Sequence, residues 1–196
     1  YTTSPGGISP HVGTEVVTSG IVTAVELGNP HYFIQEFAGP WSGVMIYNPT
    51  GPGDVERGDF IYVQGVVTEM SGTTAIEADV VVVDSSGYPL PAFSTLTAGL
   101  MNSEAYESVL VNVSDVTITD VNVPEGEWTI TDVGSNDAVV DDMYTYSYIP
   151  TLAEHIDWVQ GPVTEHNGTY KLQPRDDQDI SATYRQLPAT NWIGLI

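Results

Sequence analysis

An internal repeat constrains this chain more than any other feature of its sequence. Residues 63–74 align without a gap with residues 159–170, and eight of these twelve positions are identical. The same offset of 96 residues aligns residues 31–36 with residues 127–132, and it also aligns residues 22–25 with residues 118–121. Because three gapless matches share one offset, we interpret the chain as two copies of one folding unit.

Each copy has the pattern of a small β domain. Residues 16–25 are rich in β-branched side chains and contain a glycine, which predicts a long first strand that bends at a bulge. Turn-forming segments separate the four strands that we predict next, at residues 32–36, 44–47, 60–69 and 74–83. The best helical periodicity lies at residues 95–107, between the two copies.

Five strands in each copy favour a closed Greek-key barrel of the OB type, because closure removes exposed strand edges. A seven-stranded sandwich would need more strands than each copy supplies. We therefore predict an all-β chain of two tandem five-stranded OB-like Greek-key barrels with a short inter-barrel linker and an apolar C-terminal tail. The predicted parts are a first barrel at 1–84, a linker that can hold a short helix at 85–107, a second barrel at 108–181 and the tail at 182–196.

A family resemblance supports this fold. The segments that carry it are residues 17–25, 32–36, 43–47 and 58–65, together with the connecting residues 104–111. They resemble the tandem OB-fold modules that precede the catalytic domain of secreted bacterial nucleases. The resemblance covers most of residues 10–180 and implies a fold more than an activity. Since no segment after residue 180 is long enough for the catalytic domain, we expect the chain not to be an enzyme.

The charge balance bears on the partners of the chain. It has 4 Lys and Arg residues against 26 Asp and Glu residues, which gives a formal net charge of −22. Because nucleic-acid affinity rests largely on Lys and Arg that displace counterions, we expect this surface to disfavour nucleic acid. No run of about 18 apolar residues occurs, so we also expect no membrane insertion.

The start of the chain and its composition suggest where it acts. Cysteine is absent, and residues 1–7 have neither the basic region nor the apolar core of a secretory leader. The chain is rich in Thr, Ser, Val, Gly and Asn, with one lysine. We therefore predict an extracellular or cell-surface polypeptide whose leader has already been removed.

Catalytic and metal motifs are weak. The four histidines do not have zinc-site spacing, and neither a nucleophile elbow nor a phosphate-binding loop occurs. We name Asp176, Asp177 and Asp179 as candidate ligands for Ca²⁺, because hard oxygen ligands lie close together there. The turn glycine and distal glutamate of an EF-type loop are missing, so the alternative is a solvated acidic loop.

Aromatic residues mark a candidate ligand surface. Ligands of OB barrels usually bind on the face of the second and third strands, where aromatic side chains stack on bases or sugars. Tyr32, Trp41 and Tyr47 fall in that region of the first copy, although such aromatics can equally pack in a core. Asn167 lies in a sequon within a predicted turn and is a candidate glycosylation site.

The last residues of the chain are apolar. Trp192, Ile193, Leu195 and Ile196 would each forfeit roughly 1.5–3 kcal/mol if they stayed in water. They can fold back on their own barrels or insert into a neighbouring subunit, and the second option predicts a homo-oligomer or polymer. Our main prediction is thus a non-enzymatic extracellular structural protein that assembles into a filament or surface assembly through its termini. The alternative is an accessory binding module for nucleic acid or polysaccharide, related to secreted nucleases.

Overall fold

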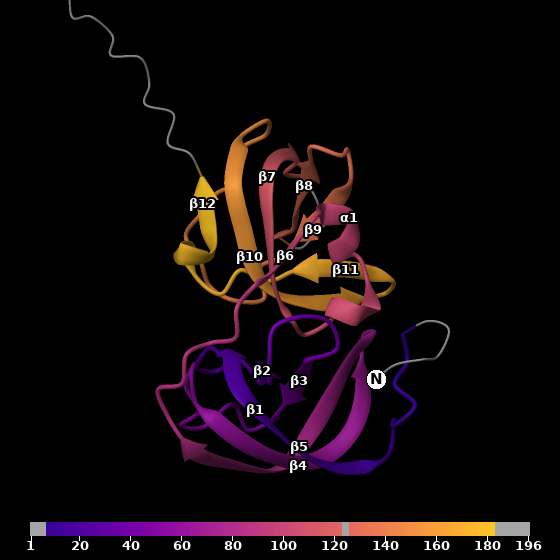
Figure 1. The fold of residues 1–196 in the computed structure, drawn as a ribbon, viewed down its shortest axis with the longest axis vertical. Helices are drawn as coiled ribbons and strands as arrows, with labels where there is room; N and C mark the ends of the chain where they lie inside the picture. Colours follow the sequence, from indigo (N-terminus) through magenta and orange to yellow (C-terminus); the bar gives the residue numbers. More distant parts are fainter. Residues whose placement is uncertain (1–6, 123–125, 183–196) are drawn as a thin grey trace, which may run out of the picture.

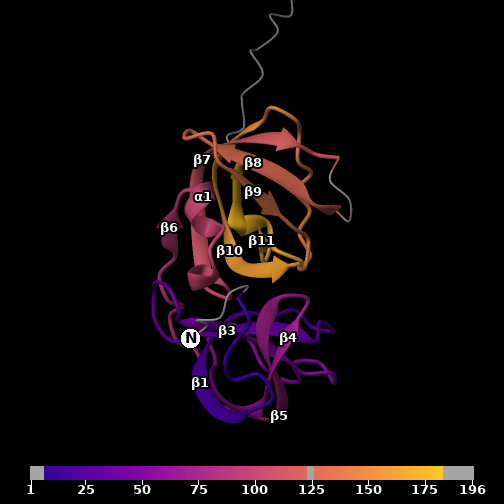
Figure 2. The same cartoon turned by 90° about the vertical axis from the view of Figure 1, so that its right-hand side faces the viewer.

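The computed structural model describes residues 7–122 and 126–182, which form two β-barrels stacked along the long axis of the molecule (Figure 1). The turned view shows the same stacking (Figure 2). Within these residues, we find no helix with the length and apolar character that a membrane crossing requires.

The first barrel consists of five strands that close in the order β1-β2-β3-β5-β4. All neighbouring strands are antiparallel except β3 and β5, which are parallel. The bounds of the strands are Glu15–Ala24 for β1, His31–Gln35 for β2, Gly43–Tyr47 for β3, Phe60–Met70 for β4 and Thr73–Ser85 for β5.

The second barrel repeats this strand order. Its strands are β7 (Leu110–Asp120), β8 (Trp128–Asp132), β9 (Asp137–Val140), β10 (His155–His166) and β11 (Thr169–Leu172). Because β10 also pairs with β7, these strands form the same cycle as β1 to β5. The predicted all-β fold of two tandem OB-like barrels is confirmed.

Short elements surround the second barrel. Strand β6 (Ser94–Leu96) runs parallel to β7, and strand β12 (Ile180–Ala182) pairs with β10. Helix α1 (Ala98–Met101) and the 3-10 turns η1 (Glu104–Tyr106) and η3 (Asp177–Asp179) complete the described elements. The segment between the barrels therefore adds a strand to the sheet of the second barrel.

The repeated glycine of the Val-Gln-Gly motif has the same structural reason in both barrels. A Cβ atom at Gly65 would overlap the carbonyl oxygen of Glu77, and one at Gly161 would overlap that of Gln173. Both pairs are related by the 96-residue offset, so each glycine lets the fourth strand of its barrel approach the fifth. The register of β1 shifts between Val22 and Ala24, after the glycine at which we expected the bulge.

Each barrel has its own apolar core, and a third cluster joins the two barrels. Tyr32 in the first barrel and Trp128 in the second are both fully buried and occupy equivalent positions. The third cluster contains Phe33 and Met45 from the first barrel and Tyr144 from the second, together with Ala24 and Ala75. The rings of Phe33 and Tyr144 meet edge to face, with 6.4 Å between their centroids.

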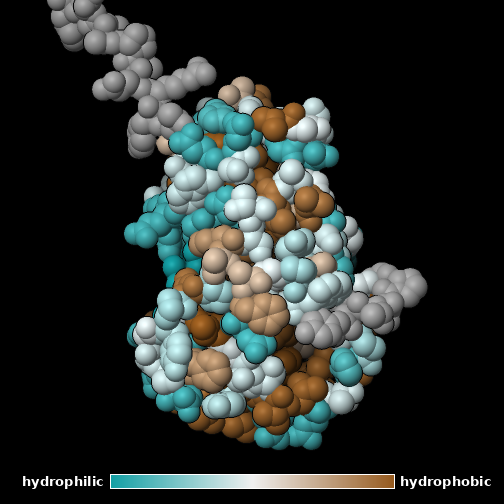
Figure 3. All heavy atoms as spheres, in the orientation of Figure 1, coloured by the Kyte–Doolittle hydropathy of each residue, from teal (hydrophilic) through white to brown (hydrophobic). Residues whose placement is uncertain are grey.

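The end of the first barrel that faces away from the second barrel has an apolar outer face (Figure 1). Tyr62 of β4 and Val80 and Val82 of β5 are about half exposed there. In the space-filling view, apolar residues gather at this lower end of the molecule (Figure 3).

Candidate ligand-binding cavity

The structure places the three predicted ligand-binding aromatics in different environments. Tyr32 is fully buried in the core of the first barrel, so its prediction as a ligand contact is wrong. Tyr47 is half-buried at the end of β3, and its ring centroid lies 5.3 Å from that of His31. Trp41, which is 38% exposed, lines a cavity. The alternative for these aromatics was a position in the core. Tyr32 occupies such a position, because it points inward from β2 as Trp128 points inward from β8.

The usual ligand face of an OB barrel is covered in the first barrel. Phe33 and Met45 lie on the outer face of β2 and β3, and Tyr144 of the second barrel packs against them. Asn29 extends this contact, because its side chain donates a hydrogen bond of 3.1 Å to the carbonyl oxygen of Met143. A ligand of the first barrel must therefore bind elsewhere.

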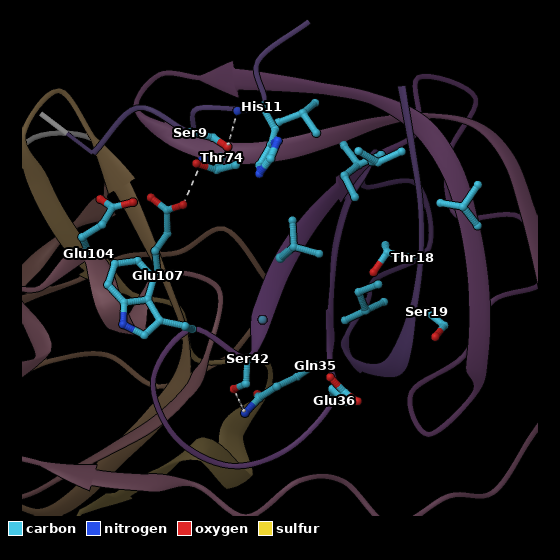
Figure 4. A pocket seen from close by; sticks show the side chains of 18 residues that line it. Ser9, His11, Thr18, Ser19, Gln35, Glu36, Ser42, Thr74, Glu104 and Glu107 are labelled. Carbon is cyan, nitrogen blue, oxygen red and sulfur yellow. Dashed lines mark hydrogen bonds between the residues drawn. The ribbon is translucent and has the colours of Figure 1, made fainter. Parts of the chain in front are cut away.

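A cavity of about 410 Å³ lies at the end of the first barrel where β1 and β3 begin. Core side chains of this barrel form its apolar part, namely Val16, Ile34, Val44, Val67 and Ile76. Its polar part includes Gln35, Ser42, Thr74, Glu104 and Glu107. Glu104 and Glu107 lie on one side of the pocket, whereas Thr18, Ser19 and Glu36 lie on the other side (Figure 4).

Contacts within the protein hold the loop that carries Trp41 in place. Trp41 has a φ of +63°, a left-handed conformation that bulky residues rarely adopt. Its backbone N–H donates a hydrogen bond of 2.7 Å to the carbonyl oxygen of Ala105 in the linker. The side chain of Gln35 donates to the carbonyl oxygen of Phe37 and accepts from the N–H of Leu110, which ties the loop to both barrels. Strained backbone of this kind is concentrated at binding sites.

Four glutamates from different parts of the chain meet beside the cavity, and we call them the carboxylate cluster. They are Glu69 of β4, Glu104 of η1, Glu107 of the linker and Glu165 of β10. Glu107 is 7% exposed, and its Oε1 accepts a hydrogen bond of 2.8 Å from the N–H of Thr74. Burial, reinforced by the charges of the other three, raises the pKa of Glu107 to about 8.

The other members of the carboxylate cluster have more partners. Glu69 accepts hydrogen bonds from the N–H of Ser9 and the hydroxyl of Thr74, and burial raises its pKa. Glu104 accepts a hydrogen bond of 2.8 Å from the hydroxyl of Tyr170. One buried oxygen of Glu69 and one of Glu107 have no hydrogen-bond partner within the described part of the chain.

Sequence reasoning did not identify the carboxylate cluster. Its members lie far apart in the chain, and acidic residues are too frequent here for any one of them to stand out. The closest signal was the resemblance at residues 104–111, which marked this segment as a connection between modules. Only the packing of that segment between the barrels brings Glu107 to the cavity.

The three candidate calcium ligands are engaged by protein groups. Asp176 forms an ion pair of 3.0 Å with Arg57, and Asp179 is buried and paired with Arg175. The side chain and backbone of Ser147 donate hydrogen bonds to Asp177, which lowers its pKa. Residues 7–122 and 126–182 contain no group of three or more His, Asp or Glu side chains that could hold a metal ion. The structure therefore gives no support to calcium at these positions.

The remaining predicted sites are not tested by the structure. Asn167 lies in the exposed turn between β10 and β11 with a φ of +51°, and its glycosylation stays a prediction. The apolar residues of the predicted tail lie outside the described residues; they are Trp192, Ile193, Leu195 and Ile196.

Comparison with known proteins gave matches only among solved structures. No protein-family model matches the chain, and no curated protein matches it. A structure described as the molecular basis for abrogation of activation of pro-inflammatory cytokines is 14% identical, covers 87% of this chain and 93% of that chain, and has a TM-score of 0.39. One described as structural mimicry for functional antagonism is 14% identical and covers 83% of this chain and 89% of that chain, with a TM-score of 0.38.

A third match is the Ifi202 HINa domain in complex with a 20-base-pair double-stranded DNA. It is 16% identical, covers 82% of this chain and 94% of that chain, and has a TM-score of 0.36. This finding contradicts the prediction that nucleic acid is disfavoured as a partner. It also contradicts the main prediction of an extracellular filament. Net charge sums over the whole surface and does not describe the groups that meet a ligand, so it could not exclude a partner class.

Proposed function

We propose that this chain is a non-enzymatic accessory binding module that acts outside the cytoplasm and binds a polysaccharide. The observation that carries the proposal is the preformed cavity of about 410 Å³ with Trp41 in its wall. Its resemblance to the modules that accompany the catalytic domain of secreted bacterial nucleases supports the accessory role. In that role, the chain would hold a polymer for a partner enzyme.

The lining of the cavity suits a saccharide ring. Sugar rings have an apolar face that packs on aromatic side chains, and Trp41 supplies such a surface. Sugar hydroxyls need hydrogen-bond acceptors and donors, which Gln35, Ser42 and Glu36 offer around the cavity. A neutral sugar also needs no Lys or Arg side chain in the site. The apolar part from the barrel core completes a pocket of the usual mixed kind.

Binding experiments with the whole chain test this function. Isothermal titration calorimetry would compare short oligosaccharides of glucose and of N-acetylglucosamine with a single-stranded and a double-stranded DNA. We expect oligosaccharide binding that hardly changes with salt and that weakens at least about tenfold in Trp41→Ala, because a stacked ring contributes roughly 1–3 kcal/mol. The matched control is Tyr62→Ala, which removes an exposed aromatic of β4 that does not line the cavity.

Two results would change the assignment. DNA binding that falls steeply with added salt and is lost in Trp41→Ala would make nucleic acid the ligand, with an unpaired base in place of the sugar. Absence of binding to every probe, or equal losses in Trp41→Ala and Tyr62→Ala, would refute a binding role for the cavity.

A further inference from the structure

Residues 104–107, which we call the linker turn, tie the wall of the cavity to both barrels. The carbonyl oxygen of Ala105 accepts the hydrogen bond of 2.7 Å that holds the backbone of Trp41. Glu107 forms a parallel β-bridge with β10 of the second barrel, and its side chain accepts a hydrogen bond of 2.8 Å from the N–H of Thr74 in β5 (Figure 4). The position of Trp41 therefore depends on how firmly this turn is held between the barrels.

The contact between the linker turn and β5 is sensitive to the charge of Glu107. This side chain is almost fully buried, and its Oε2 has no hydrogen-bond partner among the described residues. An ionised carboxylate loses its strong bonds to water on burial, and the single backbone N–H of Thr74 replaces few of them. The neutral acid loses much less, so the turn is held most firmly while Glu107 keeps its proton.

The ionisable groups around Glu107 favour the same protonation state. Those that face it from the elements packed around it are Glu69 of β4, Glu104 of η1, Glu165 of β10 and Tyr170 of β11. His11 lines the same cavity from the N-terminal segment. Burial is the main cause that raises the pKa of Glu107 from 4.5 to about 8, and the charges of the three glutamates add to it.

We propose that Glu107 is a positioning residue for ligand binding, whose neutral side chain holds the linker turn and, through Ala105, the loop that carries Trp41. Ionisation of Glu107 releases this hold and weakens ligand binding. The inference rests on the function proposed above and adds the regulation of its site by pH. The direction follows from linkage, because a turn that has opened to water lets Glu107 ionise at its ordinary pKa. Rising pH therefore favours the opened form over the range from about 4.5 to about 8.

A pH series of binding to the whole chain tests the inference. The probe is the N-acetylglucosamine oligosaccharide used for the proposed function, which carries no group that ionises in this range. We expect its dissociation constant to rise about tenfold between about pH 6.5 and about pH 9, because the fraction of chains with a closed site falls. A single proton limits the change to about tenfold per pH unit.

Variants of Glu107 separate positioning by a neutral acid from simple structural support. Glu107→Gln keeps an acceptor for the N–H of Thr74 and is neutral at every pH, so its affinity should stay constant across the series. Glu107→Ala loses the acceptor and should bind weakly throughout. Glu77→Gln, which removes an exposed carboxylate of β5, should retain the pH dependence of the unchanged chain.

Hydrogen exchange of the free chain gives a second measurement, which needs no ligand and carries the test if Glu107→Gln does not fold. The protection factor of the Trp41 N–H corrects for the intrinsic effect of pH on exchange, and it should fall between about pH 6.5 and about pH 8.5. The N–H of Tyr88 donates to the carbonyl oxygen of Gly58 outside the cavity lining, and it should keep its protection.

The outcomes separate this inference from the proposed function. Binding with one affinity across the pH series, or a pH dependence that persists in Glu107→Gln, would overturn the inference and leave the binding module. A constant protection factor at Trp41 would overturn the inference as well. Absence of binding at every pH would refute the proposed function, and the exchange of the Trp41 N–H would then decide alone whether Glu107 holds the loop.

Discussion

Replacing Tyr144 with alanine tests how the two barrels are held together. Its ring is 2% exposed and packs edge to face on Phe33 of the other barrel. A buried aromatic side chain removes about 150–250 Å² from water, which corresponds to about 4–6 kcal/mol at about 25 cal/mol per Å². Because real unfolded chains already bury part of this surface, we expect Tyr144→Ala to lower the free energy of unfolding by about 3–5 kcal/mol.

The hydrogen bond of Tyr144 contributes little to this value. Its hydroxyl lies 3.5 Å from the carbonyl oxygen of His31, at the limit for such a bond. Tyr144→Phe should therefore lose less than about 1 kcal/mol, and it is the matched control for the ring. Urea unfolding followed by circular dichroism measures both variants. A loss below about 1 kcal/mol in Tyr144→Ala, or equal losses in the two variants, would refute the reasoning that the ring joins the barrels.

Three further predictions concern packing, a buried ion pair and pH. Gly43→Ala should lower the melting temperature measured by calorimetry, because the added Cβ would overlap the carbonyl oxygen of Ser108. Such overpacking costs about 1–3 kcal/mol. An unchanged melting temperature would contradict this contact. Arg175→Ala should lower the free energy of unfolding in urea by about 3–5 kcal/mol, because it leaves the buried Asp179 without its bidentate partner. A loss below about 1 kcal/mol would show that the fold does not need this ion pair. The pKa of Glu107 is raised to about 8, so the folded chain holds its proton more strongly than the unfolded chain, and stability should fall as pH rises from about 4.5 to 8. Thermal melts across this range should show a smaller slope for Glu107→Gln, and an unchanged slope would mean that other groups cause it.

Part of the candidate site was accessible from the sequence. Trp41 was named because it falls between the second and third strands, and the structure places it in the wall of the cavity. Tyr32 was named by the same reasoning, but it points inward. The repeat contained the missing signal, because the 96-residue offset aligns Tyr32 with Trp128, and large aromatics at equivalent strand positions are typical of a core. Glu107 had no such signal, since its burial depends on two barrels packing around it.

The sequence by itself determined the repeat, the number of strands in each copy and the closed barrel. These features depend on local properties, namely β-branched runs, turn residues and glycines such as Gly65 and Gly161 that allow two strands to approach closely. The tertiary structure alone decided that Tyr144 covers the outer face of β2 and β3 and that the linker brings Glu107 beside Trp41. Contacts between residues about 60 to 110 positions apart depend on how two finished surfaces fit together, and no periodicity in the chain records that fit.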